Sequence, residues 1–425
     1  MGTEAANASH PGGFGATHSW AGMKDSPGIL LVGNFPPPYG GVPSHLQSLG
    51  PFLARAGWRV HVLTPKYSSG PTRVVDGVTV WSHAPSSTPQ QLRDLVFRCR
   101  DVVSHAPYLL KEPRRFLYLL HYAEQIARIV RDERIALISA YHILPAGLVS
   151  AWVSRQLSVP LVTSVFGEVW MDTTLFAQRR RETSLVLGTS DLMLSVSDHC
   201  ANGLRRHGYP VEVSYYGVDL DRFSGAARAD LNDRPGDPAA FPKPGEPVVL
   251  FVGRLEAEMG LGVLLDALPD LKARCPEAKV VVAGRQGGLT TRALAAAADD
   301  PSRVFVCRDA SDEAISSLYA LARVVAVPST NERACLGLAV AEASASGRPV
   351  VVANAGGGRE ILAPGGGTLV PPQDSEALVE ALLPYLGDED LATDAGKIGR
   401  AFIERHFDAK QTNAAIAERF ASLIR

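Results

Sequence analysis

The sequence lacks an excess of positive charge. Its 425 residues include 42 Lys and Arg and 44 Asp and Glu, which gives a formal net charge of −2. Proteins that follow a nucleic-acid backbone carry a basic excess, so nucleic acid is not an expected partner. With 46% hydrophobic and 20% charged residues, the composition is that of a folded globular protein. At roughly 100–200 residues per domain, the length predicts two or three domains.

Metal-binding and targeting motifs are scarce as well. The five cysteines are widely spaced and form no CxxC pair: Cys99, Cys200, Cys275, Cys307 and Cys335. We therefore expect no zinc site and a reduced, cytoplasmic compartment. Residues 1–27 lack the apolar run of roughly 7–15 residues found in a signal peptide, and we expect a disordered leader there. No apolar run reaches the roughly 18 residues that a membrane span requires. The protein could still contact a membrane surface.

The sequence does contain one pattern twice. An apolar run at 28–33 ends in glycine and is followed by a glycine loop, by a helix that Ser44 would cap and Gly57 would end, and by an apolar strand at 59–63. The pattern restarts at 247–253. There it is followed by a helix near 261–268 and by strands at 279–284, 304–306, 324–327 and 349–352. Apolar runs of this length are typical of buried parallel strands.

Repetition of this pattern predicts two doubly wound α/β domains with a cleft between them. The segment between them is rich in Ala, Asp, Gly and Pro and has no periodicity, so it is expected to be a linker. The expected division is a leader at 1–27, a first domain at 28–223, a linker at 224–246, a second domain at 247–400 and terminal helices at 401–425.

Three features near strand ends have a functional and a purely structural interpretation. Gly40 and Gly41 precede a helix start, where backbone N–H groups favour a phosphate, but a tight turn also uses glycine. Arg254 directly follows a strand and could hold a diphosphate or form a surface ion pair. Glu342 lies on a helix of small residues and could accept two vicinal hydroxyls or face solvent. The first loop has neither the GxGxxG nor the GxxxxGK[ST] fingerprint, which counts against a dinucleotide-dependent oxidoreductase and a P-loop enzyme.

In order and spacing, five blocks resemble the retaining glycosyltransferases of family 4, which have the GT-B fold of two facing Rossmann-like domains. The blocks are residues 35–42 (FPPPYGGV), 216–219 (YGVD), 251–255 (FVGRL), 328–350 (from PS through EA to GRPV) and 356–360 (GGGRE). The resemblance runs from about Gly28 to the C-terminus. It implies that Gly40 and Gly41 approach the donor phosphates, that Arg254 binds the diphosphate, and that Glu342 binds the donor ribose next to the helix start at Gly337 and Leu338.

Two departures from the family pattern concern the donor. Relatives place a Lys five residues after the Arg, and this chain has Met259 there. Relatives also have a first Glu with seven residues between it and the second, and that position is Ala334. Counting forward from residue 328 instead places the family's first Glu at Glu332. Arg333, the next residue, could then replace the missing Lys. On this resemblance we expect Glu332 and Arg254 to act in catalysis and Arg333 to bind the donor.

A third departure concerns the acceptor. After the strand at 161–165, relatives commonly have a His-Gly pair whose His lies near the reacting sugar, whereas this chain has Phe166 and Gly167 followed by Glu168. We expect Glu168 to be a base or to bind the acceptor, unless it pairs locally. Tyr39, Phe166 and His142 are the other expected acceptor residues, and a satisfied structural histidine is the alternative for His142.

Two further signals are weaker. Asp219 and Asp221 have the DxD spacing of metal-dependent transferases, but a turn is the preferred interpretation, and no metal or other cofactor is expected. The segment 91–134 mixes basic and aromatic residues, which fits either helices that shape the acceptor side or contact with an anionic membrane.

The sequence thus predicts a retaining, metal-independent glycosyltransferase that moves a sugar from a UDP- or GDP-linked donor to a small-molecule acceptor, as in natural-product glycosylation. A lipid-linked or cell-surface glycan acceptor is one alternative, and a catalytically silent subunit that binds a sugar nucleotide is another. The sequence does not assign an oligomeric state.

Overall fold

The structure is a computed structural model, and it describes residues 26–36, 40–65, 72–83, 112–224 and 241–424. Of the leader expected at 1–27, only the last two residues lie within the described residues. Tyr39, most of the expected linker and the first part of the 91–134 segment lie outside the described residues.

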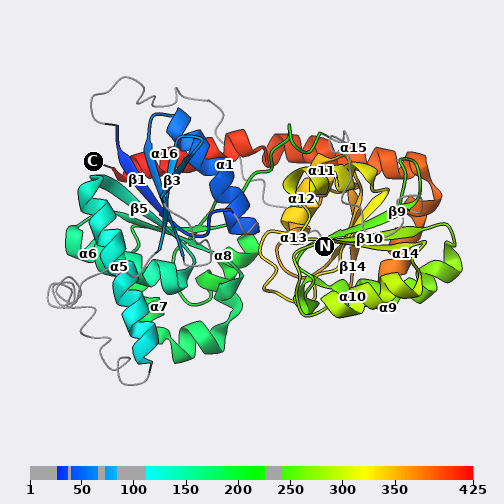
Figure 1. The fold of residues 1–425 in the computed structure, drawn as a ribbon, viewed down its shortest axis with the longest axis horizontal. Coiled ribbons are helices and arrows are strands. Elements are labelled where there is room, and N and C mark those ends of the chain that lie inside the picture. Colours follow the sequence, from blue (N-terminus) through cyan, green and yellow to red (C-terminus); the bar gives the residue numbers. More distant parts are fainter. Residues whose placement is uncertain (1–25, 37–39, 66–71, 84–111, 225–240, 425) are drawn as a thin grey trace, which may run out of the picture.

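Two α/β lobes lie side by side, each built on its own sheet (Figure 1). The first sheet has the strand order β3-β4-β2-β1-β5-β6-β7-β8, and every pairing is parallel except β3 with β4. Its strands are β1 (Gly28–Val32), β2 (Arg59–Thr64), β3 (Arg73–Val75), β4 (Val78–Ser82), β5 (Ile135–Tyr141), β6 (Leu161–Val165), β7 (Leu192–Ser195) and β8 (Glu212–Val213).

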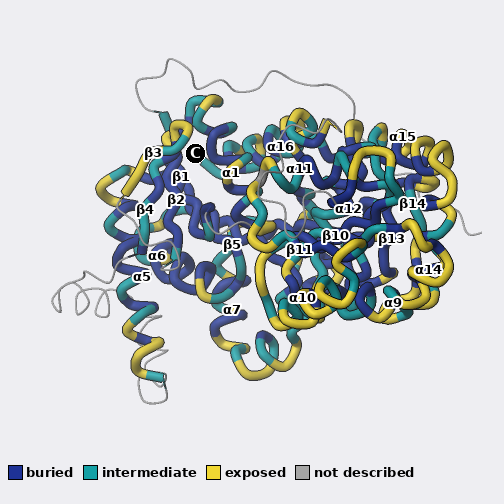
Figure 2. Tube along the Cα trace, turned by 45° about the vertical axis from the view of Figure 1, so that its right-hand side comes forward, coloured by how far each residue is buried: buried dark blue, intermediate teal, exposed yellow. Residues whose placement is uncertain are grey.

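The second sheet is parallel throughout, in the order β11-β10-β9-β12-β13-β14. Its strands are β9 (Val248–Val252), β10 (Lys279–Gly284), β11 (Val304–Arg308), β12 (Val324–Val327), β13 (Val350–Ala353) and β14 (Gly367–Val370). The two sheets confirm the predicted fold of two doubly wound α/β domains. The central strands β1 and β9 are buried except for the last residue of β9, as the runs of Val, Ile and Leu predicted (Figure 2).

Helices cover both faces of each sheet (Figure 1). In the first domain they are α1 (Gly41–Arg55), α5 (Pro113–Asp132), α6 (Leu148–Leu157), α7 (Arg180–Thr189) and α8 (Asp198–Arg205), with short helical turns η1 (Ile143–Gly147), η2 (Gly167–Trp170) and η3 (Thr173–Gln178). In the second they are η4 (Ala257–Met259), α9 (Leu261–Arg274), α10 (Thr290–Asp299), α11 (Asp312–Leu321), α12 (Leu338–Ala345), α13 (Gly358–Ile361) and α14 (Ser375–Gly387).

Helix α1 begins four residues earlier than the sequence predicted, because its cap is Gly40 and not Ser44. Gly40 is its N-cap and makes no side-chain hydrogen bond, and Ser44 lies inside the helix, where its N–H donates to the Gly40 carbonyl at 2.9 Å. The expectation that Ser44 caps this helix is therefore wrong. A glycine cap has no side chain that a sequence pattern can identify, so the hydroxyl residue nearest the apolar positions, Ser44, was predicted as the cap.

The last two helices, α15 (Glu389–His406) and α16 (Ala409–Leu423), run along both lobes and appear red in Figure 1. Helix α15 packs against α12 of the second domain, and α16 packs against α1 of the first, where Asn413 Nδ2 donates to Ser48 Oγ at 2.9 Å. The chain also crosses near Val218, which pairs with Asp408 in an isolated parallel bridge. Two segments therefore connect the domains side by side. Residue 400, the expected end of the second domain, falls inside α15.

Helix α5 shows what part of the 91–134 segment does. It packs against α6 and buries one side, including Phe116, Tyr122 and Ile126, so this part is a helix of the first domain. None of the described helices is long and apolar enough to cross a bilayer.

Candidate functional site

The predicted site residues gather on loops at the carboxyl ends of the central strands. In each sheet the strand order reverses next to the first strand, between β1 and β5 and between β9 and β12. Loops that diverge at such a point leave a crevice in which doubly wound folds bind ligands. Gly40 and Gly41 follow β1, His142 follows β5, Arg254 follows β9, and Glu332 follows β12.

A cleft of about 620 Å³ lies between the domains. Helix α1 and the 216–223 segment form one side, and α11 and α12 contribute Glu313, Ser316, Leu338 and Glu342 to the other. Glu342 Oε2 accepts a hydrogen bond from the buried Tyr319 hydroxyl at 2.8 Å. Burial and this carboxylate keep the pKa of Tyr319 well above its usual value, so the phenol stays a donor that orients Glu342. Arg254, Glu332 and Glu168 do not line this cleft.

The glycine loop meets the start of α12. A Cβ on Gly41 would lie 3.5 Å from Leu338 Cδ1, in ordinary van der Waals contact, so the two predicted donor segments touch across the domains. Helix α1 has no acidic residue in its first turn, and Gly337 is the N-cap of α12. Two helix starts therefore lie near each other, and N–H groups at helix starts favour an anion.

Arg254 and Arg333 converge on one carboxylate. Arg254 Nη2 is paired with Glu258 Oε1, and Arg333 Nη1 lies 3.7 Å from Glu258 Oε2. Position 259 is a methionine, as the sequence shows, and Arg333 brings a second cation to Arg254 from the loop after β12. Glu258 was not among the predicted site residues, although its spacing of four residues from Arg254 is that of a helical ion pair.

Glu332 faces the first domain. Its carboxylate Oε2 lies 3.3 Å from His199 Nε2, and its backbone carbonyl is 2.6 Å from the same nitrogen. The Gly356 N–H points to Oε2 at 3.4 Å, which brings together the 328–350 and 356–360 blocks. The Glu332 side chain remains about half exposed, at 52%.

His142, Phe166 and Glu168 form one group, although they come from two strands. His142 Nδ1 lies 3.0 Å from Glu168 Oε2, and the His142 ring lies 4.5 Å from the Phe166 ring, centroid to centroid. Glu168 Oε1 also accepts the Ile143 N–H at 3.2 Å. The carboxylate is therefore engaged at both oxygens and largely covered, with 15% of the side chain exposed against 41% for His142.

The backbone of His142 is strained. Its φ of 80° lies in a region that favours glycine, at a cost of about 1–3 kcal/mol for another residue. Its N–H donates to Ser164 O and its carbonyl accepts from Gly147 N, both at 3.0 Å, so the strained turn is held from both sides. Strain of this kind concentrates at functional sites.

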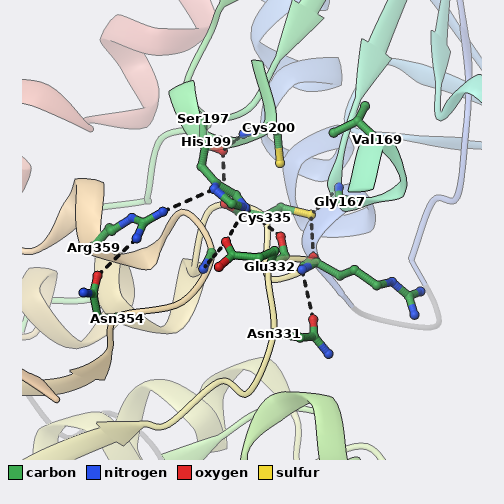
Figure 3. A network of polar contacts seen from close by, with 12 residues as sticks. Gly167, Val169, Ser197, His199, Cys200, Asn331, Glu332, Cys335, Asn354 and Arg359 are labelled. Carbon is green, nitrogen blue, oxygen red and sulfur yellow. Dashed lines mark hydrogen bonds and ion pairs between the residues drawn. The ribbon is translucent and has the colours of Figure 1, made fainter. Parts of the chain in front are cut away.

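The 331–335 loop docks the second domain onto the first (Figure 3). Gly167 N–H donates to Cys335 Sγ at 2.9 Å, and Ser197 Oγ donates to Cys335 O at 3.1 Å. A Cβ on Gly167 would lie 2.1 Å from Arg333 O, so only glycine permits this approach. The loop that carries Glu332 and Arg333 is thus positioned by the residue next to Glu168.

Glu360 makes a second contact between the domains, and it was not among the predicted site residues. Its carboxylate accepts the N–H groups of Asp198 at 2.8 Å and His199 at 2.6 Å, at the start of α8, and the Tyr215 hydroxyl at 3.0 Å. Because the N-terminus of a helix favours negative charge, this carboxylate holds the second domain against α8. The GGGRE block is the signal that could have indicated it.

The DxD segment is a turn. Asp219 Oδ1 accepts the N–H groups of Asp221 and Arg222, both at 3.0 Å, and Asp221 pairs with Lys410. Asp219 thus forms an Asx turn, and Asp221 is paired with a cation of helix α16. Within the described ranges, no group of three or more His, Cys, Asp or Glu side chains is arranged to hold a metal ion.

Two family models match adjacent parts of the chain. Residues 39–222 match the model described as Glycosyltransferase Family 4, and residues 233–402 match Glycosyl transferases group 1. Together they cover both domains and every candidate residue named above.

Curated relatives and a solved structure agree with these models. A GDP-mannose-dependent alpha-(1-6)-phosphatidylinositol monomannoside mannosyltransferase of Mycolicibacterium smegmatis is 26% identical over 92% of this chain and 97% of its own length. An alpha-D-kanosaminyltransferase of Streptomyces kanamyceticus is 28% identical over 56% of this chain, which spans 64% of that protein. The fold is that of sucrose-phosphate synthase from Thermosynechococcus elongatus, with a TM-score of 0.71 at 23% identity over 93% of this chain and 99% of that one.

Proposed function

Because the chain belongs to glycosyltransferase family 4 and has the GT-B fold, we propose that it transfers a sugar from a UDP- or GDP-linked donor to a hydroxyl of a small molecule, with retention of the anomeric configuration. The pair of guanidinium groups on Glu258 carries the proposal. Two cations held together beside a strand end fit the two phosphates of a nucleoside diphosphate. In the proposed complex the diphosphate replaces the Glu258 carboxylate between Arg254 and Arg333.

Each site residue has a role in this proposal. Glu342, oriented by Tyr319 on the wall of the cleft, accepts the ribose hydroxyls. Gly40, Gly41, Gly337 and Leu338 provide close backbone approach to the phosphates. Glu332, beside Gly356, binds hydroxyls of the transferred sugar.

The reaction breaks the bond between the anomeric carbon and the phosphate oxygen and forms a bond from that carbon to the acceptor oxygen on the same face. The acceptor hydroxyl gives up its proton as the new bond forms, and the departing diphosphate takes up a proton, so that atoms and charge balance. Arg254, Arg333 and the helix N-termini stabilise the negative charge that develops on the nucleoside diphosphate. Since two guanidinium groups supply this charge, we propose turnover that persists in EDTA.

Two acceptor classes are supported by different relatives. The kanosaminyltransferase favours a small natural product, which is the class we propose. The mannosyltransferase, which aligns over 97% of its length, favours an inositol lipid as the second candidate. A panel of aminoglycoside-type and inositol-containing acceptors, with vesicles in the second set, would separate the two classes.

Nucleotide binding and donor turnover test the proposal. A thermal-shift screen should show stabilisation by UDP or by GDP that grows with the logarithm of nucleotide concentration. Purified protein should then release that diphosphate from UDP-glucose or GDP-mannose. Tight binding without release, across the whole acceptor panel, would instead identify a catalytically silent subunit.

A further inference from the structure

One histidine projects a free ring nitrogen at the junction of the two domains. His142 Nδ1 is held by Glu168 Oε2 at 3.0 Å, and the described residues offer its Nε2 no hydrogen-bond partner. We infer that Nε2 of His142 accepts a hydrogen bond from the attacking hydroxyl and that Glu168 is a positioning residue for this imidazole. The inference rests on the proposed function, because it assigns the residue that orients the acceptor in that reaction.

The hydrogen bonds of Glu168 fix which ring nitrogen carries the proton. Oε1 accepts the Ile143 N–H, so the carboxylate cannot turn away, and Oε2 requires a donor. In neutral histidine this places the hydrogen on Nδ1 and leaves a lone pair on Nε2. A lone pair of this kind accepts a hydrogen bond from a hydroxyl, whereas a protonated ring would not.

The position of His142 brings the ring to the reacting end of the site. Phe166 occupies the place after β6, and the ring beside it comes from the neighbouring strand β5. Gly167 and Glu168 follow directly, and Gly167 contacts the loop that carries Glu332 and Arg333. A residue as exposed as His142 thus lies between the acceptor domain and the loop proposed to hold the donor.

The charged and titratable groups that act on His142 come from two elements. Burial lowers the pKa of His142, but Glu168 on η2 and Cys335 on the docking loop raise it, and the net direction is upward. For Glu168, burial raises the pKa, and the contact with His142 and two backbone N–H groups outweigh it, so the carboxyl pKa is lowered. Glu168 therefore stays ionised while His142 titrates, and the acceptor form of Nε2 exists above the His142 pKa.

Histidine NMR tests the contact without any need for turnover. Protein labelled at histidine Cε1 is titrated as wild type and as Glu168→Gln, and the His142 resonance is assigned by its loss in His142→Gln. The His142 pKa should be lower in Glu168→Gln, because the amide keeps the shape but loses the charge that favours imidazolium. Identical titration in both proteins would overturn the role of Glu168.

The pH dependence of donor turnover tests the role of His142. Water replaces the acceptor hydroxyl when the protein hydrolyses UDP-glucose or GDP-mannose, so diphosphate release measures the same interaction. In wild type the rate should rise with pH as His142 loses its proton. This rise of the rate with pH, the limb, should move to lower pH in Glu168→Gln and disappear in His142→Gln. In His142→Gln, kcat at high pH should be about tenfold lower than in wild type.

His207→Gln is the matched control. His207 Nε2 also pairs with a carboxylate, that of Asp172 at 3.0 Å, on the same domain but away from the docking loop. This variant should keep the wild-type limb. An unchanged limb in His142→Gln would overturn the inference, whereas absence of turnover in the wild type would count against the proposed function itself and leave the NMR result standing.

Discussion

Arg254 and Arg333 reach Glu258 from two different loops, after β9 and after β12. Arg254→Ala should weaken binding of the nucleoside diphosphate by about 1.5 kcal/mol, or roughly tenfold, the lower end of the range for a charged hydrogen bond. The lower end applies because the Arg254 side chain is 42% exposed and solvent screens its charge. Calorimetric titration of UDP and GDP gives the dissociation constants.

Arg292 provides the comparison for this substitution. It is a similarly exposed arginine on α10 that pairs with Asp266 on α9, far along the same domain. Arg292→Ala should leave nucleotide affinity unchanged. Equal affinities for Arg254→Ala and wild type would remove the main support for the diphosphate site.

His45 connects one side chain to the pH dependence of stability. It stacks on Tyr216 with ring centroids 3.4 Å apart, and burial lowers its pKa to about 3. In the unfolded chain the pKa is about 6.5, so unfolding takes up a proton below that pH and stability falls as the pH falls from 6.5 toward 3. Between pH 7.5 and 5.5 this group should cost about 1.4 kcal/mol of the unfolding free energy.

His45→Phe keeps an aromatic ring on Tyr216 and cannot titrate. Urea unfolding of wild type and variant at both pH values isolates the contribution, because the other histidines are common to both proteins. A variant that loses as much stability as the wild type over this interval would show that His45 is not the group responsible.

At the residue scale, the sequence indicated the cations and carboxylates that stand directly at strand ends. Arg254 and Glu342 could be singled out because Arg254 directly follows a strand and Glu342 lies on a helix of small residues, and their roles stay predictions. Glu332 required a choice of counting direction, and the structure brings it to Gly356. The pairing of His142 with Glu168 could not be predicted, since the two residues are 26 positions apart and meet only because β5 and β6 are neighbours.

Among the elements, the docking loop at 331–335 depends on a glycine that faces it. A Cβ on Gly357 would lie 1.8 Å from Cys335 O and 3.0 Å from Ser197 Oγ. Because Cys335 O is a backbone atom, it cannot move aside without displacing the loop. Gly357→Ala should therefore destabilise the protein by about 1–3 kcal/mol, as overpacking does, and raise the KM for donor by displacing Glu332 and Arg333. Thermal unfolding and donor kinetics measure the two effects.

Gly188→Ala is the matched substitution for this element. Gly188 lies in α7 with nothing within 4 Å of an added Cβ, and alanine in a helix is more favourable than glycine by about 0.5–1 kcal/mol. That variant should be as stable as wild type or slightly more so. If Gly357→Ala behaved in the same way, the docking loop would not be under the steric constraint described.

Element boundaries show where sequence patterns lose information. The strands that the sequence predicted begin and end within about two residues of those in the structure, because a buried parallel strand must be apolar throughout. The strands β3, β4, β7, β8 and β14 were not predicted. The start of α1 was misplaced because its cap is Gly40, and the extent of α15 was missed because its first turns expose Glu389, Asp390 and Leu391. Hydrophobic periodicity finds the middle of a helix better than its ends.

For the whole molecule, two doubly wound domains could be predicted from the repeated pattern, but their contacts could not. The contacts join residues from separate domains, such as Ser197 with Cys335, and no local pattern specifies such a pair. The two crossings near Val218 and Asp408 leave the domains hinged at one side and docked through the 331–335 loop and Glu360 at the other. These polar contacts add to apolar packing between the domains, because buried residues of both belong to one continuous hydrophobic core.

Glu360 should govern the balance between open and closed arrangements. Glu360→Gln keeps the shape of the side chain but removes the charge that faces two N–H groups at the start of α8. Each of these charge-assisted hydrogen bonds contributes at most about 1.5–3 kcal/mol. Solution X-ray scattering should show a larger radius of gyration for the variant, and saturating nucleotide should reduce the difference, because a ligand that binds both domains favours the closed form. Glu380→Gln, which alters an exposed carboxylate paired with Arg274 on the same domain, should scatter as wild type does. If Glu360→Gln also scattered as wild type, with and without nucleotide, the remaining contacts of the docking loop would be sufficient to hold the domains closed.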